Sequence, residues 1–197
     1  MLALYHCPFT RSHLIRFVLE ELGLPHELRR VNVPAGEHKA PAYLRLNPLG
    51  QLPTLLDDDL TLREAAAIAL HLGDKAPVGG LSPEPGSAAR APYYQWVVFS
   101  VASELSALAK LMGADPAALS LARAEWATVA DALTLGLQER SFLLGERFSI
   151  ADAMVGGSLC LAQFLGVLSP YPRLLRYYQD VSSRPAFARA FADAVPA

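Results

Sequence analysis

A segment near the middle of the chain is so rich in proline and glycine that neither a helix nor a strand can run through it. Six of the ten residues from 77 to 86 are proline or glycine, a composition typical of loops and linkers. Before this segment apolar residues come in short runs, and after it they recur with helical spacing. The 197-residue sequence therefore predicts two small domains, residues 1–76 and 87–197, joined by a linker at residues 77–86.

The first 76 residues alternate strand-like and helical segments, which predicts an α/β domain. Residues 2–5 form a short apolar run, and residues 12–22 carry apolar side chains at helical spacing as far as Gly23, which can end a helix. With a second extended segment at 26–33, this order predicts a parallel pair of strands joined by a right-handed crossover. The remaining predicted elements are a helix at 41–46, strands at 52–56 and 60–62, and an alanine-rich helix at 64–72.

After the linker the spacing of apolar residues predicts helices throughout, and thus an all-α helical bundle. The stretch from Tyr93 to Met112 is apolar and about as long as a membrane span, but serine, glutamine, glutamate and lysine interrupt it. That pattern favours a helix buried in the bundle or at a subunit interface, so no membrane partner is expected. The predicted helices lie near residues 87–112, 116–139, 149–165, 171–182 and 185–193.

Charge, cysteine content and the N-terminal residues argue against several classes of function. The formal net charge is −2 and no basic patch stands out, so nucleic-acid binding has no electrostatic support. The N-terminus lacks the pattern of a secretory signal, which predicts a cytoplasmic protein. Cys7 and Cys160 are far apart in sequence, and a disulfide is not expected in a reducing compartment. No histidine and cysteine cluster has metal-ligand spacing, so no metal is predicted.

Two motifs, one on each side of the linker, carry most of the functional information. The first reads NPLGQLPTL at residues 47–55 and continues as LREAAAI at residues 62–68. The second reads LGERFSIAD at residues 144–152. Together they resemble the motifs of cytosolic glutathione transferases. The resemblance implies a thioredoxin-like N-terminal domain, an all-α C-terminal domain, a homodimer, and glutathione as co-substrate with no other cofactor.

The dipeptide Leu52–Pro53 stands at the start of a predicted strand, where thioredoxin-like folds carry a cis proline. A cis bond here would expose the backbone N–H and C=O of Leu52, and an extended peptide could pair with them as an added strand. The resemblance implies that the cysteinyl unit of glutathione does so. The alternative is an ordinary trans proline at a strand edge.

Glu64 begins the alanine-rich helix. It could simply cap that helix through the favourable interaction of an acid with the helix dipole. The resemblance implies instead that Glu64 pairs with the α-amino group of glutathione, while N–H groups at the helix start receive the γ-glutamyl carboxylate. The serine usual after this glutamate is Ala65, and one lost hydrogen bond to a charged group costs about 1.5–3 kcal/mol. The residues that could supply other donors are Arg63, Gln51, His38 and Lys39.

The loop before the first helix must supply the group that activates the glutathione thiol, because the thiolate is the nucleophile. We expect Ser12 or Thr10 to donate a hydrogen bond to it, assisted by the helix N-terminus and Arg11. Ser12 could instead be the N-cap of the helix. Cys7 is the alternative nucleophile, since Cys7-Pro8-Phe9 resembles the Cys-Pro-Phe of omega-class enzymes, although an ungapped alignment puts Cys7 two residues too early. Cys7 could also be a small buried residue.

The second substrate is expected to be a small hydrophobic electrophile. Family placement implicates Phe9, Tyr93 and Trp96, although aromatic residues at helical spacing are more often core. The leading function is conjugation of glutathione to such an electrophile. The alternatives are a glutathione-dependent thiol–disulfide oxidoreductase using Cys7, and a non-catalytic binding module with the same fold.

Overall fold

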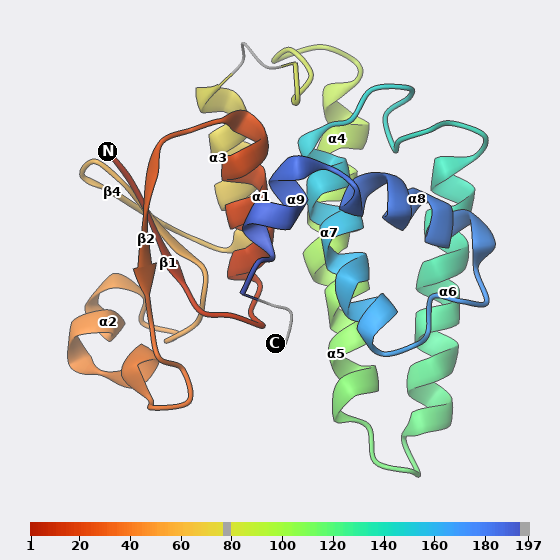
Figure 1. Cartoon of the computed structure of the whole chain (residues 1–197), viewed down its shortest axis with the longest axis horizontal. Coiled ribbons are helices and arrows are strands. Elements are labelled where there is room, and N and C mark those ends of the chain that lie inside the picture. The colour runs from red at the N-terminus through yellow and green to blue at the C-terminus, as the bar shows by residue number, and fades with distance from the viewer. Residues whose placement is uncertain (77–79, 194–197) are drawn as a thin grey trace. The chain divides into compact units, whose positions relative to one another are not determined.

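The computed structural model describes residues 1–76 and 80–193 of the chain (Figure 1). The chain divides into two compact units, and each has its own apolar core. One unit runs from Met1 to Ala76 and includes the C-terminal segment that starts at Pro185, while the other ends at Arg184. Residues 77–79 of the predicted linker lie outside the described residues.

Four strands of the N-terminal unit form one mixed sheet in the order β2-β1-β3-β4. The central strand β1 pairs in parallel with β2 and antiparallel with β3, and β3 pairs antiparallel with β4. The predicted order βαβ followed by ββα is thereby confirmed. The strands are β1 (Leu2–His6), β2 (His26–Arg30), β3 (Thr54–Asp57) and β4 (Leu60–Arg63).

Within residues 1–76, three helices and one short 3₁₀ turn accompany the sheet. α1 and α3 pack against each other, and α2 lies apart from them in Figure 1. Gly23 ends α1 in the left-handed conformation with φ of 63°, as its position in the sequence predicted. The bounds are α1 (Ser12–Leu22), η1 (Glu37–Lys39), α2 (Pro41–Leu46) and α3 (Ala65–Lys75).

Several predicted boundaries differ from the structure, among them the end of the segment predicted at 26–33, which leaves the sheet after Arg30, and two in the first motif that have local reasons. The strand expected at 52–56 begins only at Thr54, because the Leu52–Pro53 bond is cis and takes these residues out of the ladder. The helix expected at 64–72 begins at Ala65, since Glu64 has a φ of 67° and a ψ of 116°, which is not helical. Both departures occur within the first motif.

The second unit is built from helices that surround α7. Eleven of the fifteen residues of α7 are buried, and it packs against α4, α5 and α8. The long helix expected at 87–112 is interrupted by a π-helical turn, η3. The bounds are α4 (Arg90–Phe99), η3 (Ser100–Glu104), α5 (Leu105–Gly113), α6 (Leu119–Leu137), α7 (Ile150–Phe164) and α8 (Pro172–Ser182).

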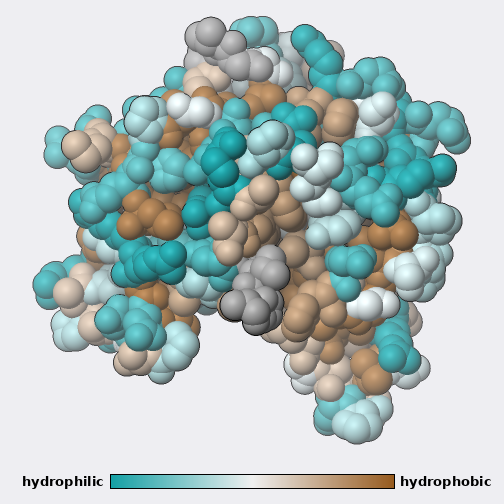
Figure 2. Space-filling model, viewed as in Figure 1, coloured by the Kyte–Doolittle hydropathy of each residue, from teal (hydrophilic) through white to brown (hydrophobic). Residues whose placement is uncertain are grey.

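The helical run from Arg90 to Gly113 is long and apolar enough to cross a membrane by length and composition alone, with 44% of its most apolar window buried. Its apolar side chains are explained by packing, since α4 contacts α7 and α5 contacts α6. Figure 2 shows a mixed polar and apolar surface, with apolar residues gathered toward the lower part of the helical unit. Met112 and Phe164 are among the exposed large apolar side chains of this unit.

The C-terminal helix α9 (Pro185–Ala190) groups with the N-terminal unit, whereas the sequence placed all of 87–197 in one domain. It packs on α1 through aromatic rings. Phe187 stacks on Phe191 with centroids 4.2 Å apart, and its ring meets Phe17 edge-on at 5.4 Å. The contact between Phe17 and Phe187 joins residues that are distant in sequence, so the periodicity of the segment could not reveal it.

Candidate active site

Strand register brings three segments of the predicted site to one end of the sheet. Tyr5 of β1 lies opposite Thr54 of β3, and Thr54 lies opposite Arg63 of β4. Three segments therefore meet at the same end of the sheet, because one follows β1, one precedes β3 and one follows β4. These are the loop from Cys7 to Arg11, the Leu52–Pro53 peptide, and Glu64.

The Leu52–Pro53 peptide bond is cis, which removes the trans alternative. The carbonyl before it is held firmly, because Gln51 O accepts hydrogen bonds from the Tyr43 hydroxyl at 2.7 Å and from Asn47 Nδ2 at 2.9 Å. Asn47 and Tyr43 are both buried. The backbone of Leu52 thus stands outside the β3 ladder in a fixed orientation, available to an extended peptide.

Glu64 lies at the start of α3 without capping it through its side chain. Its backbone carbonyl accepts a hydrogen bond from Ile68 N, while its side chain is exposed. A non-glycine residue at φ of 67° costs on the order of 1–3 kcal/mol and persists where the surroundings impose it. This arrangement leaves the Glu64 carboxylate free for a ligand cation. Ala65 follows as a buried residue.

The remaining predicted ligand donors lie around the loop that precedes the cis bond. Arg63 Nε donates to Leu46 O at 2.6 Å, and Lys39 Nζ donates to Leu49 O at 2.9 Å. The Gln51 side chain is exposed. His38 Nδ1 is buried and makes no hydrogen bond within residues 1–76 and 80–193. Two cations are therefore already tied to backbone carbonyls beside the site.

The hydroxyl groups of Thr10 and Ser12, at the start of α1, differ in burial. Ser12 is completely buried, and its Oγ lies 2.8 Å from His6 Nδ1 and 2.7 Å from Thr10 Oγ1. Ser12 is the first residue of α1 and makes no capping bond, with Arg11 at the N-cap position, so the N-cap interpretation is wrong. Thr10 is partly exposed, and its hydroxyl lies within hydrogen-bond distance of a second acceptor, Cys7 O, at 2.8 Å.

Two further residues of this loop contrast in exposure. Phe9 is 71% exposed and holds a φ of 61°, so its ring projects from the loop. The Cys7 side chain is buried, with 8% of the residue accessible. Of the two, Phe9 is the one whose side chain lies at the surface.

Tyr93 and Trp96 are buried in the helical unit, which favours the core interpretation for both. Tyr93 is fully inaccessible. Trp96 packs directly on α6, where a Cβ added at Gly136 would lie 2.3 Å from the indole ring. Only a glycine allows this approach, and the tight fit explains why Trp96 stabilises the bundle.

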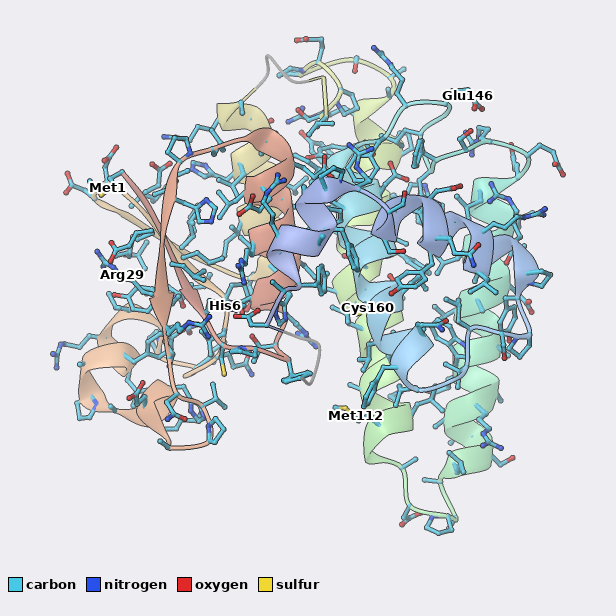
Figure 3. The ribbon with its side chains drawn as sticks, viewed as in Figure 1. Met1, His6, Arg29, Met112, Glu146 and Cys160 are labelled. Atoms are coloured by element: carbon cyan, nitrogen blue, oxygen red, sulfur yellow. The ribbon has the colours of Figure 1, made fainter. Side chains whose placement is uncertain are left out.

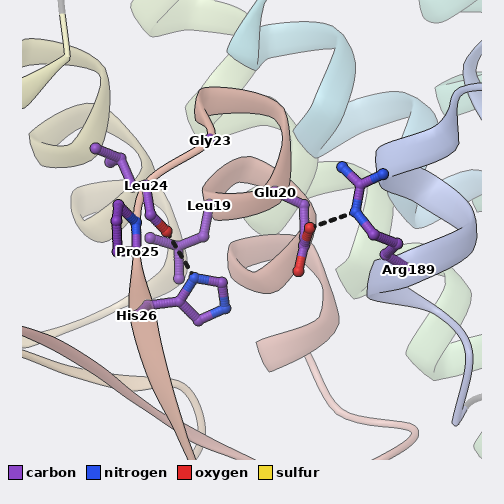
Figure 4. Close-up of a pocket in the computed structure, with 7 residues that line it drawn as sticks. All are labelled: Leu19, Glu20, Gly23, Leu24, Pro25, His26 and Arg189. Atoms are coloured by element: carbon purple, nitrogen blue, oxygen red, sulfur yellow. Dashed lines mark hydrogen bonds and ion pairs between the residues drawn. The ribbon is translucent and has the colours of Figure 1, made fainter.

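A shallow hollow of about 330 Å³ lies at the other end of α1 from the site (Figure 4). The Glu20–Arg189 ion pair at 2.6 Å and the hydrogen bond from His26 Nδ1 to Leu24 O are its polar features. Glu20 and Arg189 are paired with each other, and the hollow contains none of the predicted site residues. It is not the candidate active site.

Sequence reasoning missed a polar cluster next to the loop. His6, His13 and Asp193 bring possible metal-ligand atoms within 4.8 Å of one another. However, the Asp193 carboxylate already accepts hydrogen bonds from Arg16 and Arg30, each at 3.0 Å. Two guanidinium groups on the same carboxylate disfavour a metal cation. Nothing in the sequence pairs Asp193 with His6, because 187 positions separate them.

Comparison with known proteins agrees with this geometry. Residues 1–74 match the glutathione S-transferase N-terminal domain, and residues 116–180 match the glutathione S-transferase C-terminal domain. Glutathione S-transferase 3 of Zea mays is 30% identical, over 99% of this chain and 95% of the relative. The disulfide-bond oxidoreductase YfcG of Escherichia coli is 27% identical, over 96% and 94% of the two chains.

A solved structure shows the same fold with a ligand bound. The glutathione transferase URE2P6 of Phanerochaete chrysosporium, in complex with oxidized glutathione, superposes with a TM-score of 0.89 at 27% identity. The match covers 98% of this chain and 96% of the other. The thioredoxin-like fold of the N-terminal unit and the helical C-terminal unit are those of these relatives. The chain belongs to the glutathione S-transferase family.

Proposed function

We propose that this protein is a glutathione transferase that conjugates the glutathione thiolate to small hydrophobic electrophiles. The observation that carries the proposal is the cis Leu52–Pro53 peptide, which stands outside the sheet ladder. It lies at the same end of the sheet as Glu64, whose carboxylate makes no capping bond to α3. An extended backbone site next to an exposed acid suits a peptide with a free amino group. Glutathione is such a peptide, and relatives with solved structures bind it.

In the proposed complex, the cysteinyl unit of glutathione pairs with the backbone of Leu52. The Glu64 carboxylate binds the α-amino group, and the N–H groups at the start of α3 receive the γ-glutamyl carboxylate. Arg63, Lys39, His38 and Gln51 lie around this position and supply further donors. Ala65 contributes its backbone N–H alone, so we expect weaker binding than in a relative with serine there.

The proposed chemical step requires a donor for the thiolate. Thr10 is partly exposed whereas Ser12 is buried behind it, so Thr10 is the hydroxyl that can turn toward sulfur. A hydrogen bond to a charged acceptor is about twice as strong as one between neutral groups, which favours this rotation. The α1 N-terminus and Arg11 add positive potential. The thiol proton leaves to solvent, sulfur bonds to the electrophilic carbon held near Phe9, and the leaving group departs with its bonding electrons.

Two observations favour a second function, which is thiol–disulfide exchange through Cys7. One is the name of a relative, and the other is the position of Cys7 in the chain. YfcG is named a disulfide-bond oxidoreductase, and Cys7 lies in the loop before α1 in this chain. The Cys7 thiolate would attack the glutathione sulfur of a disulfide between glutathione and a substrate thiol, bond to that sulfur and release the substrate as a thiolate. A second glutathione thiolate would then attack the mixed disulfide, release the Cys7 thiolate and form glutathione disulfide. We rank thiol–disulfide exchange below conjugation, because Cys7 is buried.

Glutathione binding is tested first, by calorimetry on the full chain. We expect Glu64→Gln to weaken binding by at least about 10-fold, because a hydrogen bond to a charged group contributes about 1.5–3 kcal/mol. Glu27→Gln is the matched control, since Glu27 is exposed on β2 and pairs with Arg29. Equal affinity in both variants, or no binding by the wild type, would contradict the proposed site.

Activity assays then separate the two chemistries. We expect Thr10→Ala to lower the conjugation of a halogenated arene while Thr10→Ser keeps most of it, because serine retains the hydroxyl. Cys7→Ser should preserve conjugation and abolish any disulfide reduction. Loss of both activities in Cys7→Ser would assign the chemistry to the cysteine. Tight glutathione binding with neither activity would leave a non-catalytic binding module.

The proposal also includes a homodimer in the cytoplasm, where thiols remain reduced. Tyr94 and Val98 on α4 are exposed apolar side chains that a second copy could cover. Sedimentation velocity measures the mass of the full chain directly. A monomer at micromolar concentration would contradict the dimer.

A further inference from the structure

Asp193, from the segment after α9, lies at the centre of a group of four donors. Its carboxylate is 20% exposed and accepts hydrogen bonds from His6 Nε2 at 3.3 Å and His13 Nε2 at 3.0 Å. Arg16 and Arg30 each donate to it at 3.0 Å. Figure 3 shows His6 at the end of β1, beside α1. The last part of the chain thereby touches the strand that leads into the active-site loop.

The charge state of this group is fixed at neutral pH. Burial alone would raise the pKa of Asp193, but hydrogen bonds from His13 and His6 and the charge of Arg16 lower it well below its usual range. Burial lowers the pKa of His6 to about 4, and neighbouring His13 adds to the effect. At neutral pH Asp193 is therefore a carboxylate and His6 is a neutral imidazole.

These charge states determine where each hydrogen lies. A carboxylate only accepts, so His6 Nε2 must carry the imidazole hydrogen and Nδ1 must be bare. The Ser12 hydroxyl, 2.8 Å from Nδ1, then has to donate to it. Since its one hydrogen is committed, Ser12 Oγ can only accept from its other neighbours. Those are Thr10 Oγ1 at 2.7 Å and Cys7 N at 3.3 Å.

We propose that Asp193 is a positioning residue for the active-site loop, acting through His6 and Ser12. The carboxylate selects one tautomer of His6, and that tautomer makes Ser12 an acceptor that holds the Cys7 N–H and the Thr10 hydroxyl. When Thr10 turns toward a thiolate, Ser12 keeps Cys7 N–H as its donor, so the loop keeps its shape. The inference rests on the proposed function only in assigning this loop to the glutathione sulfur.

Loss of the carboxylate leaves His6 free to adopt either tautomer. With hydrogen on Nδ1, His6 donates to Ser12, and the Ser12 hydrogen turns to Thr10 Oγ1, which is 2.7 Å away. Thr10 can then no longer donate to Ser12, so its single hydrogen turns to Cys7 O at 2.8 Å. The loop then has two competing hydrogen-bond patterns instead of one. A donor that must reorganise stabilises the developing charge less well than a fixed one.

The kinetic test compares Asp193→Asn with a matched control on the same helix pair. Arg189→Gln removes the Glu20–Arg189 ion pair, which also ties α9 to α1 but does not touch His6. We expect Asp193→Asn to lower kcat for conjugation by about 10-fold, as small misplacements at reactive groups do, with KM for glutathione within about 2-fold. Arg189→Gln should leave both constants unchanged. Equal losses in the two variants would show that only helix docking matters.

A double-mutant cycle tests whether Asp193 acts through Ser12. Ser12→Ala cuts the same chain of contacts at its other end without altering a charge. The double variant should lose no more kcat than either single variant, because both remove one pathway. Multiplying losses would overturn the proposal. If Asp193→Asn fails to fold, Ser12→Ala with the wild type still measures the contribution of the chain.

Nitrogen NMR of the His6 ring provides a readout that does not depend on catalysis. In the wild type we expect the tautomer with hydrogen on Nε2, and in Asp193→Asn a mixture of both tautomers. Hydrogen on Nδ1 in the wild type would overturn the inference. If glutathione does not bind but the tautomer is as expected, the proposed function fails while the hydrogen-bond chain stands.

Discussion

Glu64 and Ala65 show how much of the candidate site depends on single residues. Glu64 adopts a positive φ that strains a residue with a side chain, and this conformation carries its carboxylate out of α3. Ala65 is buried next to it and offers only a backbone N–H. The sequence identified both residues, but the strain that frees Glu64 from capping is visible only in the folded backbone.

The alanine predicts a gain of affinity on substitution. Ala65→Ser adds the hydroxyl that the family resemblance implies at this position, so we expect glutathione to bind about 10-fold more tightly. Isothermal titration calorimetry measures the change. Unchanged or lower affinity would show that the buried side chain at this position does not reach the carboxylate.

At the scale of elements, the loop between α2 and β3 is held by buried side chains on both sides. Tyr43 from α2 and Thr54 from β3 share a hydrogen bond of 2.9 Å. Asn47 and Tyr43 both donate to Gln51 O. The backbone around the cis bond is thus held by more than Pro53 itself. Tyr43 of α2 and the adjacent Asn47 fix the Gln51 carbonyl.

This network predicts a binding defect without a chemical one. Tyr43→Phe removes one of two donors to Gln51 O, so we expect KM for glutathione to rise about 5-fold with little change in kcat. Tyr5→Phe is the control, since the Tyr5 ring packs edge-on against Tyr43 with centroids 5.5 Å apart, but its hydroxyl contacts Arg29. A fall in kcat alone in Tyr43→Phe would contradict the prediction.

The start of α7 predicts a defect in stability instead. Asp152 is fully buried and accepts hydrogen bonds from Leu143 N, Ser149 N and the Tyr177 hydroxyl, each at 2.9 Å. Asp152→Ala leaves these donors unsatisfied, so we expect the free energy of unfolding to fall by about 3 kcal/mol. Urea denaturation measures this, with the exposed Asp180→Ala as control. A preserved melting temperature with lost turnover would assign Asp152 to catalysis.

At the scale of the whole molecule, the two units contain buried ionisable groups whose pKa values shift in opposite senses. Burial lowers the pKa of His6 to about 4 in the N-terminal unit and lowers that of His13 as well. In the helical unit, burial raises the pKa of Glu104 well above its usual value, and the nearby Ser158 hydroxyl offsets only part of this. Tyr177 also faces Glu104, and burial raises its pKa too.

These shifts predict opposite responses to acid. Between about pH 6.5 and about pH 4, His6 and His13 are protonated in the unfolded chain but remain neutral in the folded protein. The N-terminal unit therefore loses stability as pH falls through this range. Above about pH 4.3 folded Glu104 keeps a proton that the unfolded chain releases, so the helical unit gains stability as pH falls. Hydrogen exchange at about pH 5 and about pH 7, corrected for intrinsic rates, should show less protection in β1 and more in α7.

Glu104→Gln is the matched variant for this experiment. The amide does not titrate, so the gain in α7 protection at the lower pH should shrink while the loss in β1 remains. Asp152, whose pKa burial also raises, accounts for any gain that persists. Parallel shifts in both units would contradict the prediction.

The sequence by itself determined the main elements and predicted the binding half of the candidate site. Short apolar runs before the linker and helical spacing after it gave the two architectures, because these periods reflect which face of each element is buried. The Leu52–Pro53 and Glu64 positions followed from one local motif. All of this information lies within a few residues along the chain.

Tertiary structure decided which hydroxyl is exposed, which aromatics are core, and what holds the loop. Ser12 and Thr10 look equivalent in sequence, yet His6 lies against only one of them and buries it. Trp96 is fixed by Gly136 from another helix. Asp193 reaches His6 across most of the chain. Hydrophobic periodicity records burial along one element, whereas a hydrogen bond between distant segments depends on the packing of several elements at once.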